Sequence, residues 1–179
     1  DRHLALHLPT EAGQGAARLL AQAGLAGNAA YLLLAPWTSC QARTYFPARF
    51  GLAARQLADH LGWPVVVVGR EGDGESAAEV LAPLGNRAVD LVGATTVGEL
   101  AAVVAGSRLV LANNTSVLHL ADALDRPMVI AYAGTDLESQ WGPRRAPARL
   151  LRKPTFCAPC YKFACPYNRE CMELAPEEI

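Results

Sequence analysis

The run Val65-Val66-Val67-Val68 carries a β-branched side chain at every position and ends at Gly69. Valine favours strands, and a strand without polar alternation is typical of a parallel sheet that is covered on both faces. Helical periodicity on either side, at residues 47–61 and 73–81, indicates helices that would supply this cover. The run therefore predicts an α/β fold with a buried parallel sheet.

The same alternation of short apolar runs and longer amphipathic stretches continues in both directions. Further strands are expected at 31–35, 89–92, 109–111 and 128–131, and further helices at 10–23, 97–105 and 115–124. Strands that alternate with helices in this way are typical of parallel sheets. Five strands are therefore predicted, each followed by a loop at its carboxyl end.

Length and composition point to one domain. The 179 residues, of which 51% are hydrophobic, suffice for one ordinary core but not for two. We expect a leading helix and hinge over 1–29, a sheet domain over 30–145, and a Cys-rich tail over 146–179 that packs back on the domain. The chain begins at Asp1 without a leader, and its last residues are similar to the first turn of a helix, so we expect a fragment of a cytoplasmic protein.

Charge and hydropathy argue against two classes of partner. The net charge is −1, and no basic run is longer than a pair such as Arg144-Arg145, which argues against nucleic acid. Apolar runs such as 31–36 are far shorter than the roughly 20 residues that a membrane-spanning helix requires. We therefore expect neither nucleic-acid binding nor a membrane span.

Polar residues gather where the expected strands end. Ligands of open parallel sheets bind at the carboxyl ends of the strands, so the loops that start at Pro36, Gly69, Gly93, Ala112 and Tyr132 should share one crevice. This crevice is the predicted site.

The segment Asn114-Thr115-Ser116 runs from an expected strand straight into a helix. These residue types cap helix N-termini, and the exposed N–H groups of such a helix start favour an anion. His119 falls one turn further along. A capped helix with a partly buried histidine would explain the same residues, so the segment needs support from other loops.

Three other loops offer this support, each beside a plainer explanation. Thr38, Ser39 and Arg43 supply two hydroxyls and a guanidinium that suit phosphate, or they form a solvated loop. Asp73 follows a glycine turn, from which dinucleotide folds often bond ribose hydroxyls, or it caps a helix. Thr95 lies where backbone contacts to a base would be made, or it belongs to the cap of the next helix.

Several other enzyme classes lack their motifs. No G-x-G-x-x-G follows the first expected strand, which disfavours a nicotinamide cofactor, and no P-loop is present. The sequence also has no nucleophile elbow and no convincing Ser/His/Asp or Cys/His arrangement.

Three ordered motifs span most of the chain. Thr38–Phe50 has a small-residue loop, a basic residue, an aromatic and Pro-x-Arg-Phe; Asn114–Pro127 includes His119-Leu120-Ala121; and Gly134-Thr135-Asp136 precedes Trp141-Gly142-Pro143. Together they resemble glycosyltransferase family nine, the heptosyltransferase family, over residues 31–179. Many members of this family have lysine in place of Arg43.

The resemblance implies a GT-B transferase of two Rossmann-like halves, of which this chain is the carboxyl-terminal, donor-binding half with a doubly wound parallel sheet. It implies sugar transfer from a nucleoside-diphosphate sugar, with ADP-heptose as the first candidate. The acceptor would be a lipopolysaccharide core or related lipid-linked glycan at the inner face of the cytoplasmic membrane. The reaction would invert the anomeric centre without a catalytic metal. The general base would lie in the other half, so this chain alone is expected to bind donor but to transfer no sugar.

Roles for single residues follow from the resemblance by position. The donor-binding residues would be Thr38, Ser39 and Arg43 at the diphosphate, Asp73 at the ribose, Thr95 at the base, and Asn114, Thr115, Ser116 and His119 at the phosphates and the sugar. Asn114 stands where most members have aspartate and Ser116 where they have glycine, so a sugar other than heptose stays open. Two other interpretations also stay open, a non-catalytic nucleotide-sugar-binding or interaction module and a nucleotide-sugar epimerase.

Four of the five cysteines, Cys157, Cys160, Cys165 and Cys171, lie within a short stretch of the tail. Four thiols suffice for tetrahedral zinc, and Cys157-Ala-Pro-Cys160 has the usual spacing of a ligand pair. The second pair is more widely spaced than usual. Structural zinc, disulfides formed on oxidation and free packed thiols are the three open interpretations.

Overall fold

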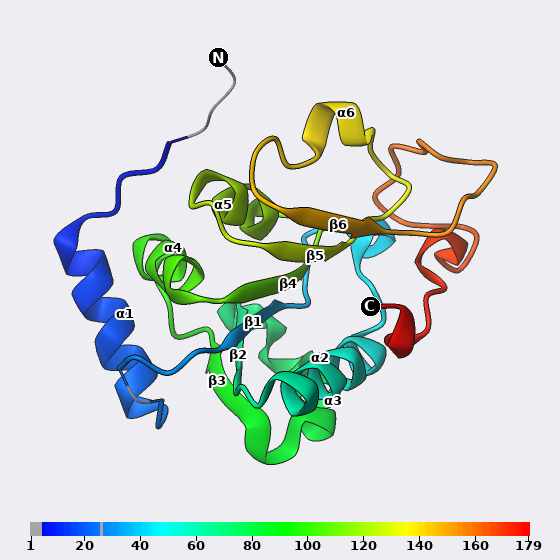
Figure 1. Cartoon of the computed structure of the whole chain (residues 1–179). Helices are drawn as coiled ribbons and strands as arrows, with labels where there is room; N and C mark the ends of the chain where they lie inside the picture. The colour runs from blue at the N-terminus through cyan, green and yellow to red at the C-terminus, as the bar shows by residue number, and fades with distance from the viewer. Residues whose placement is uncertain (1–4, 26) are drawn as a thin grey trace.

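A computed structural model describes residues 5–25 and 27–179 of the chain. Its centre is a six-stranded sheet with the order β3-β2-β1-β4-β5-β6, in which every neighbouring pair is parallel (Figure 1). The strands are β1 Leu32–Ala35, β2 Val65–Gly69, β3 Ala88–Val92, β4 Leu109–Asn113, β5 Met128–Ala131 and β6 Ala148–Leu151. This is the strand order of the doubly wound Rossmann fold, so the predicted fold class is confirmed.

Helices cover both faces of the sheet (Figure 1). They are α1 Thr10–Gln22, α2 Pro47–Leu61, α3 Gly74–Leu84, α4 Val97–Gly106 and α5 Ser116–Ala123, while the short α6 Glu138–Trp141 lies in the connection between β5 and β6. α2 packs against α3 on one face, while α4 packs against α1 and α5 on the other. Of the expected leading segment 1–29, residues 1–4 and 26 lie outside the described residues. Within the described part, no helix has the length and apolar character needed to cross a membrane.

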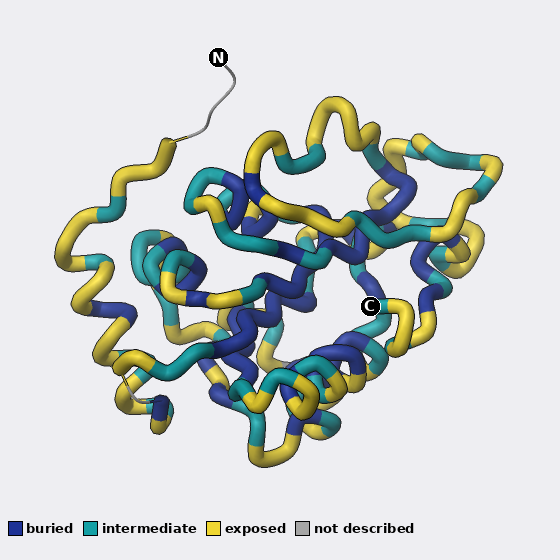
Figure 2. The backbone as a smooth tube through the Cα atoms, in the orientation of Figure 1, coloured by how far each residue is buried: buried dark blue, intermediate teal, exposed yellow. Residues whose placement is uncertain are grey.

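Alternation along the central strands divides the core into two layers. Leu33 and Val66 pack with α1, α4 and α5, whereas Leu32, Leu34 and Val65 pack with α2 and α3. All five side chains are completely buried, which explains why β1 and β2 are apolar at every position. Figure 2 shows these buried strands at the centre of the molecule.

The tail contributes more to the fold than its sequence indicated. No periodicity was expected after Gly142, yet Ala148–Leu151 forms β6, which pairs in parallel with β5 along the sheet edge. Its first two residues are exposed and the next two only partly buried, so it has no apolar run to reveal it. Further on, Met172 and Leu174 are buried in the α2–α3 layer. The three-part division of the chain stays a prediction.

Candidate functional site

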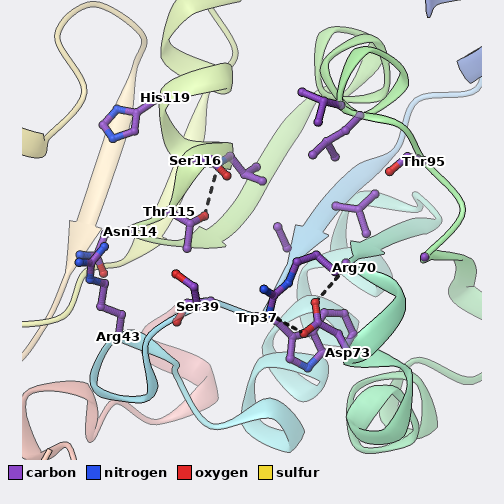
Figure 3. A pocket seen from close by; sticks show the side chains of 18 of the residues that line it. Trp37, Ser39, Arg43, Arg70, Asp73, Thr95, Asn114, Thr115, Ser116 and His119 are labelled. Carbon is purple, nitrogen blue, oxygen red and sulfur yellow. Dashed lines mark hydrogen bonds and ion pairs between the residues drawn. The ribbon is translucent and has the colours of Figure 1, made fainter. Parts of the chain in front are cut away.

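A crevice of about 760 Å³ opens at the carboxyl ends of the strands, around the point between β1 and β4 where the strand order reverses. This is where open α/β sheets bind their ligands. Figure 3 shows side chains from several loops along its walls. All nine residues that the sequence singled out line the crevice: Thr38, Ser39, Arg43, Asp73, Thr95, Asn114, Thr115, Ser116 and His119.

The loop after β1 uses its two hydroxyls differently. The Thr38 hydroxyl donates to the Cys40 carbonyl at 2.6 Å, accepts from the Cys40 N–H at 2.9 Å and lies 2.9 Å from the Thr44 hydroxyl. The Ser39 side chain is exposed, and its hydroxyl makes no hydrogen bond with the described residues. Thr38 therefore holds the loop in shape, and Ser39 is the hydroxyl that can reach a ligand.

Arg43 ends the short helical turn Gln41–Arg43 and faces the crevice. Its Nε lies 3.3 Å from Asp136 Oδ2, and its side chain is 33% exposed. This ion pair lacks hydrogen-bond alignment, and Nε donates to no acceptor in the described chain. Nε itself is buried, so the donors that a ligand can reach are the terminal Nη1 and Nη2 groups, which make no hydrogen bond with the described residues.

Two consecutive asparagines at the end of β4 point in opposite directions. Asn113 is completely buried, accepts from the Tyr45 N–H at 2.9 Å and donates to the Pro36 carbonyl at 2.6 Å. It thereby pins both ends of the loop that carries Arg43. Asn114 faces the loop after β5, where it accepts from the Ala133 N–H and donates to the Asp136 carboxylate, both at 3.1 Å.

Helix α5 begins at the floor of the crevice. The Thr115 hydroxyl caps it by accepting from the Val117 N–H at 3.3 Å. The exposed Ser116 hydroxyl has no partner among the described residues. His119 lies one turn further, with its ring 6.1 Å from that of Trp141. Burial lowers the pKa of His119, and Arg144 adds to this while Asp122 opposes it, so the imidazole is neutral at pH 7.

Asp73 and Thr95 lie on the opposite side of the crevice from Arg43 and His119 (Figure 3). The Asp73 carboxylate accepts from the Arg70 N–H at 2.8 Å and pairs with the Arg70 guanidinium at 3.3 Å. Asp73 occupies the N-cap position of α3, but its carboxylate makes no capping hydrogen bond there and instead closes the turn that begins at Arg70. Thr95 leaves the capping of α4 to its neighbour Thr96, which forms a capping box with Glu99.

Apolar side chains that the sequence did not single out lie at the same end. Val97 and Leu100 of α4 line the crevice there, and Val97 is 80% exposed. Trp37 packs over Gly69, where a Cβ atom would stand 2.6 Å from the indole ring. Its ring nitrogen donates to the Ser76 hydroxyl at 2.8 Å. This end of the crevice therefore combines a carboxylate with apolar surfaces.

The tail holds the loops that carry Arg43 and Asp136. The Ala42 N–H donates to the Phe163 carbonyl at 3.0 Å, and the Cys165 N–H donates to the Gln41 side chain at 2.9 Å. Arg169 donates to the Thr44 carbonyl at 2.7 Å, and the Tyr161 N–H donates to the Thr135 carbonyl at 3.0 Å. The segment 161–169 is thus a second layer behind one wall of the crevice.

All five cysteines are free thiols. Burial raises the pKa of Cys171, the Gly134 N–H lowers it, and the nearby Cys165, Cys157 and Cys160 raise it further. Across residues 5–25 and 27–179, no three His, Cys, Asp or Glu side chains are arranged to hold a metal ion. The structure thus gives no support to structural zinc at these cysteines.

Comparison with known proteins assigns the chain to a family. Residues 7–170 match the model of glycosyltransferase family 9 (heptosyltransferase). Lipopolysaccharide heptosyltransferase 2 of Salmonella typhimurium is 28% identical over 132 residues, which cover 70% of this chain and 37% of that protein. The chain therefore spans well under half the length of this relative.

Solved structures share the fold. Escherichia coli ADP-heptose lipopolysaccharide heptosyltransferase II superimposes with a TM-score of 0.77 at 22% identity, over 97% of this chain and 50% of that one. The family 9 glycosyltransferase of Veillonella parvula gives a TM-score of 0.83 at 18% identity, over 98% of this chain and 51% of that one. With its Rossmann-like sheet and its match over residues 7–170, the chain belongs to glycosyltransferase family 9, the heptosyltransferase family.

Proposed function

We propose that this chain is the donor-binding half of a glycosyltransferase that takes a sugar from a nucleoside-diphosphate sugar. The observation that carries the proposal is the state of Arg43, a partly exposed guanidinium in the crevice whose terminal Nη groups make no hydrogen bond with the described residues. Arginine binds phosphate oxygens in a bidentate manner, and helix N-termini favour anions. Arg43 and the start of α5 therefore suit a diphosphate.

The remaining residues fit around that diphosphate. Ser39, Ser116 and Thr115 offer hydroxyls near it, while Thr38 shapes the loop. Asp73 suits the ribose, because a ribose hydroxyl can replace the exposed Arg70 side chain on its carboxylate. Thr95, with Val97 and Leu100 beside it, suits the base. His119 lies toward the sugar end, and Asn114 completes that wall through Asp136.

ADP-heptose is the proposed donor, and a lipopolysaccharide core or related lipid-linked glycan is the proposed acceptor. The names of the relatives support both assignments. We propose that the acceptor and the general base are held by a second half outside this chain, in the cytoplasm at the inner face of the membrane. Transfer would invert the anomeric centre without a catalytic metal, since Arg43 and the helix N-terminus can stabilise the leaving diphosphate. The chain alone is expected to show no transfer activity.

Thermal unfolding with ADP, UDP, GDP or NAD tests the proposal. ADP at about 100 times its Kd stabilises the folded state by about 2.7 kcal/mol. For a chain of this size, that raises the midpoint by about 5 to 10 °C. NAD is expected to give no shift, because the glycine fingerprint of nicotinamide sites is absent. If no nucleoside diphosphate shifts the midpoint, a non-catalytic interaction module explains the chain better.

His119 should make ADP binding depend on pH. Its pKa is lowered by burial in the free protein, so the ring gains its proton at a lower pH than an ordinary histidine does. A positive ring near the diphosphate strengthens binding by about 1 kcal/mol, or about fivefold. The measurement compares ADP affinity from about pH 7.5 to about pH 5 in the wild type and in His119→Gln.

The comparison removes the titration of ADP itself, which both proteins share. His60→Gln is the matched control, because His60 is exposed on α2. Identical pH profiles for the wild type and His119→Gln would show that His119 does not interact with the diphosphate.

A further inference from the structure

Asp136 is the centre of a polar network at the sugar end of the crevice. Its side chain is 14% exposed and lines the crevice. The Thr135 hydroxyl donates to Oδ2 at 2.7 Å, the Asn114 amide donates to it at 3.1 Å, and Arg43 Nε lies 3.3 Å away. All three partners therefore converge on one carboxylate oxygen.

The other oxygen of Asp136, Oδ1, makes no hydrogen bond or ion pair with the described residues. A carboxylate oxygen can accept two hydrogen bonds, and a bond from a hydroxyl to a carboxylate is charge-assisted. Asp136 is thus fixed through one oxygen and keeps the other as an acceptor for a ligand.

The neighbouring Asn114 is committed to protein partners. It is buried, with 6% exposure, and its Oδ1 accepts from the Ala133 N–H. A backbone N–H can only donate, which fixes the amide so that its NH₂ group faces Asp136. An aspartate at this position would instead bring a second negative charge to Asp136. The role of Asn114 is therefore to orient Asp136.

The chemistry of Asp136 selects what can lie against it. A carboxylate accepts hydrogen bonds and repels phosphate, so its ligand carries hydroxyl donors and no negative charge. Arg43 neutralises Asp136 and so permits a diphosphate nearby. The proposed ribose and base groups, Asp73 and Thr95, lie across the crevice from Arg43 and Asn114, two of the partners of Asp136 (Figure 3). A neutral sugar attached beyond the diphosphate fits this position.

We propose that Asp136 recognises the transferred sugar by accepting a hydrogen bond from one of the sugar hydroxyls, and that Asn114 is a positioning residue for Asp136. This inference rests on the proposed function, since it places a sugar on the nucleotide of the same crevice. It assigns sugar recognition to the loop after β5 and not to the start of α5.

Calorimetric titration of purified protein with ADP and with ADP-heptose separates the two proposals. In Asp136→Asn, the ratio of the ADP Kd to the ADP-heptose Kd falls about tenfold, as expected for one charge-assisted hydrogen bond, while ADP still binds. Glu138→Gln is the matched control, because Glu138 lies two residues away, is 43% exposed and faces Arg152. It should leave the ratio unchanged.

Asn114→Ala tests positioning through a double-mutant cycle. It should lower the same ratio in the wild type but have little further effect in Asp136→Asn, because both changes act on one contact. Independent, additive effects of the two substitutions would overturn the positioning role.

The outcomes are distinct. An unchanged ratio in Asp136→Asn overturns the inference and leaves nucleotide-sugar binding intact, whereas a wild type that binds neither ligand overturns both proposals. Monodeoxy analogues of ADP-heptose give a test on the wild type, should Asp136→Asn not fold. Loss of one sugar hydroxyl should weaken binding about tenfold. A series in which no single hydroxyl matters would contradict the inference.

Discussion

Replacement of Arg43 by alanine is expected to weaken ADP binding about a hundredfold. A bidentate arginine–phosphate contact contributes about 3 kcal/mol, and about 1.4 kcal/mol corresponds to a tenfold change in Kd. Arg43 can make this contact because Asp136 lies against Nε and leaves the terminal Nη donors without a hydrogen bond to the described residues. Calorimetric titration of wild-type and variant protein with ADP measures the loss.

Two further substitutions separate charge from geometry. Arg43→Lys keeps the charge but loses the planar fork, so about a tenfold weakening is expected. Arg18→Ala removes an exposed arginine of α1 that does not line the crevice, and it should bind ADP as the wild type does. An Arg43→Ala variant with undiminished affinity would exclude Arg43 from the diphosphate site.

Replacement of Asp122 by alanine is expected to lower the free energy of unfolding by about 3 kcal/mol. Asp122 is 3% exposed and accepts three backbone N–H groups, from Arg144, Arg145 and Ala146, each at 2.9 Å. Without the carboxylate, these donors lose their acceptor where little water can replace it. The bonds also tie the end of α5 to the segment that leads into β6. Urea unfolding at neutral pH measures the effect.

The same carboxylate should make stability depend on acid. Burial alone would raise the pKa of Asp122, but the three N–H donors and His119 lower it below the usual range. Its contribution is therefore fully present above the unfolded pKa of about 3.9 and is lost as the pH falls through the lower folded value. The stability difference between wild type and Asp122→Asn should shrink over this range. Asp125→Asn, at a side chain that is 54% exposed, is the control and should change stability by less than about 0.5 kcal/mol.

The central fold could be predicted because its strands are apolar on both faces. β2 and β5 begin where the sequence analysis predicted them. A buried parallel strand is apolar at every position, so it can be recognised without knowing which strands it pairs with. β6 could not be predicted in this way. Ala148–Leu151 is a short edge strand with an exposed arginine, and its pairing depends on β5, whose paired residues lie 20 positions earlier in the chain.

The position of the crevice could be predicted, but the hydrogen bonds within it could not. The rule for parallel strands brought nine candidate residues to one edge, and all nine line it. Asn113 was missed, and the interaction of Asn114 with Asp136 was not foreseen, because their partners lie in other loops. One indication was present, since consecutive residues at the end of a strand point to opposite sides. Asn113 and Asn114 therefore could not serve the same loop.

The hydrogen bonds between the tail and the Arg43 loop also affect the order in which parts of the fold form during synthesis. Residues 40–44 obtain hydrogen-bond partners from residues 162–169, at separations of 121 to 125 positions along the chain. Contacts of this range form late, because a long loop must first close. A nascent chain can therefore assemble β1, β2 and β4 well before it holds Arg43 in place. A chain that lacks residues 162–169 is therefore expected to form these strands but to hold the Arg43 loop mainly through Asn113.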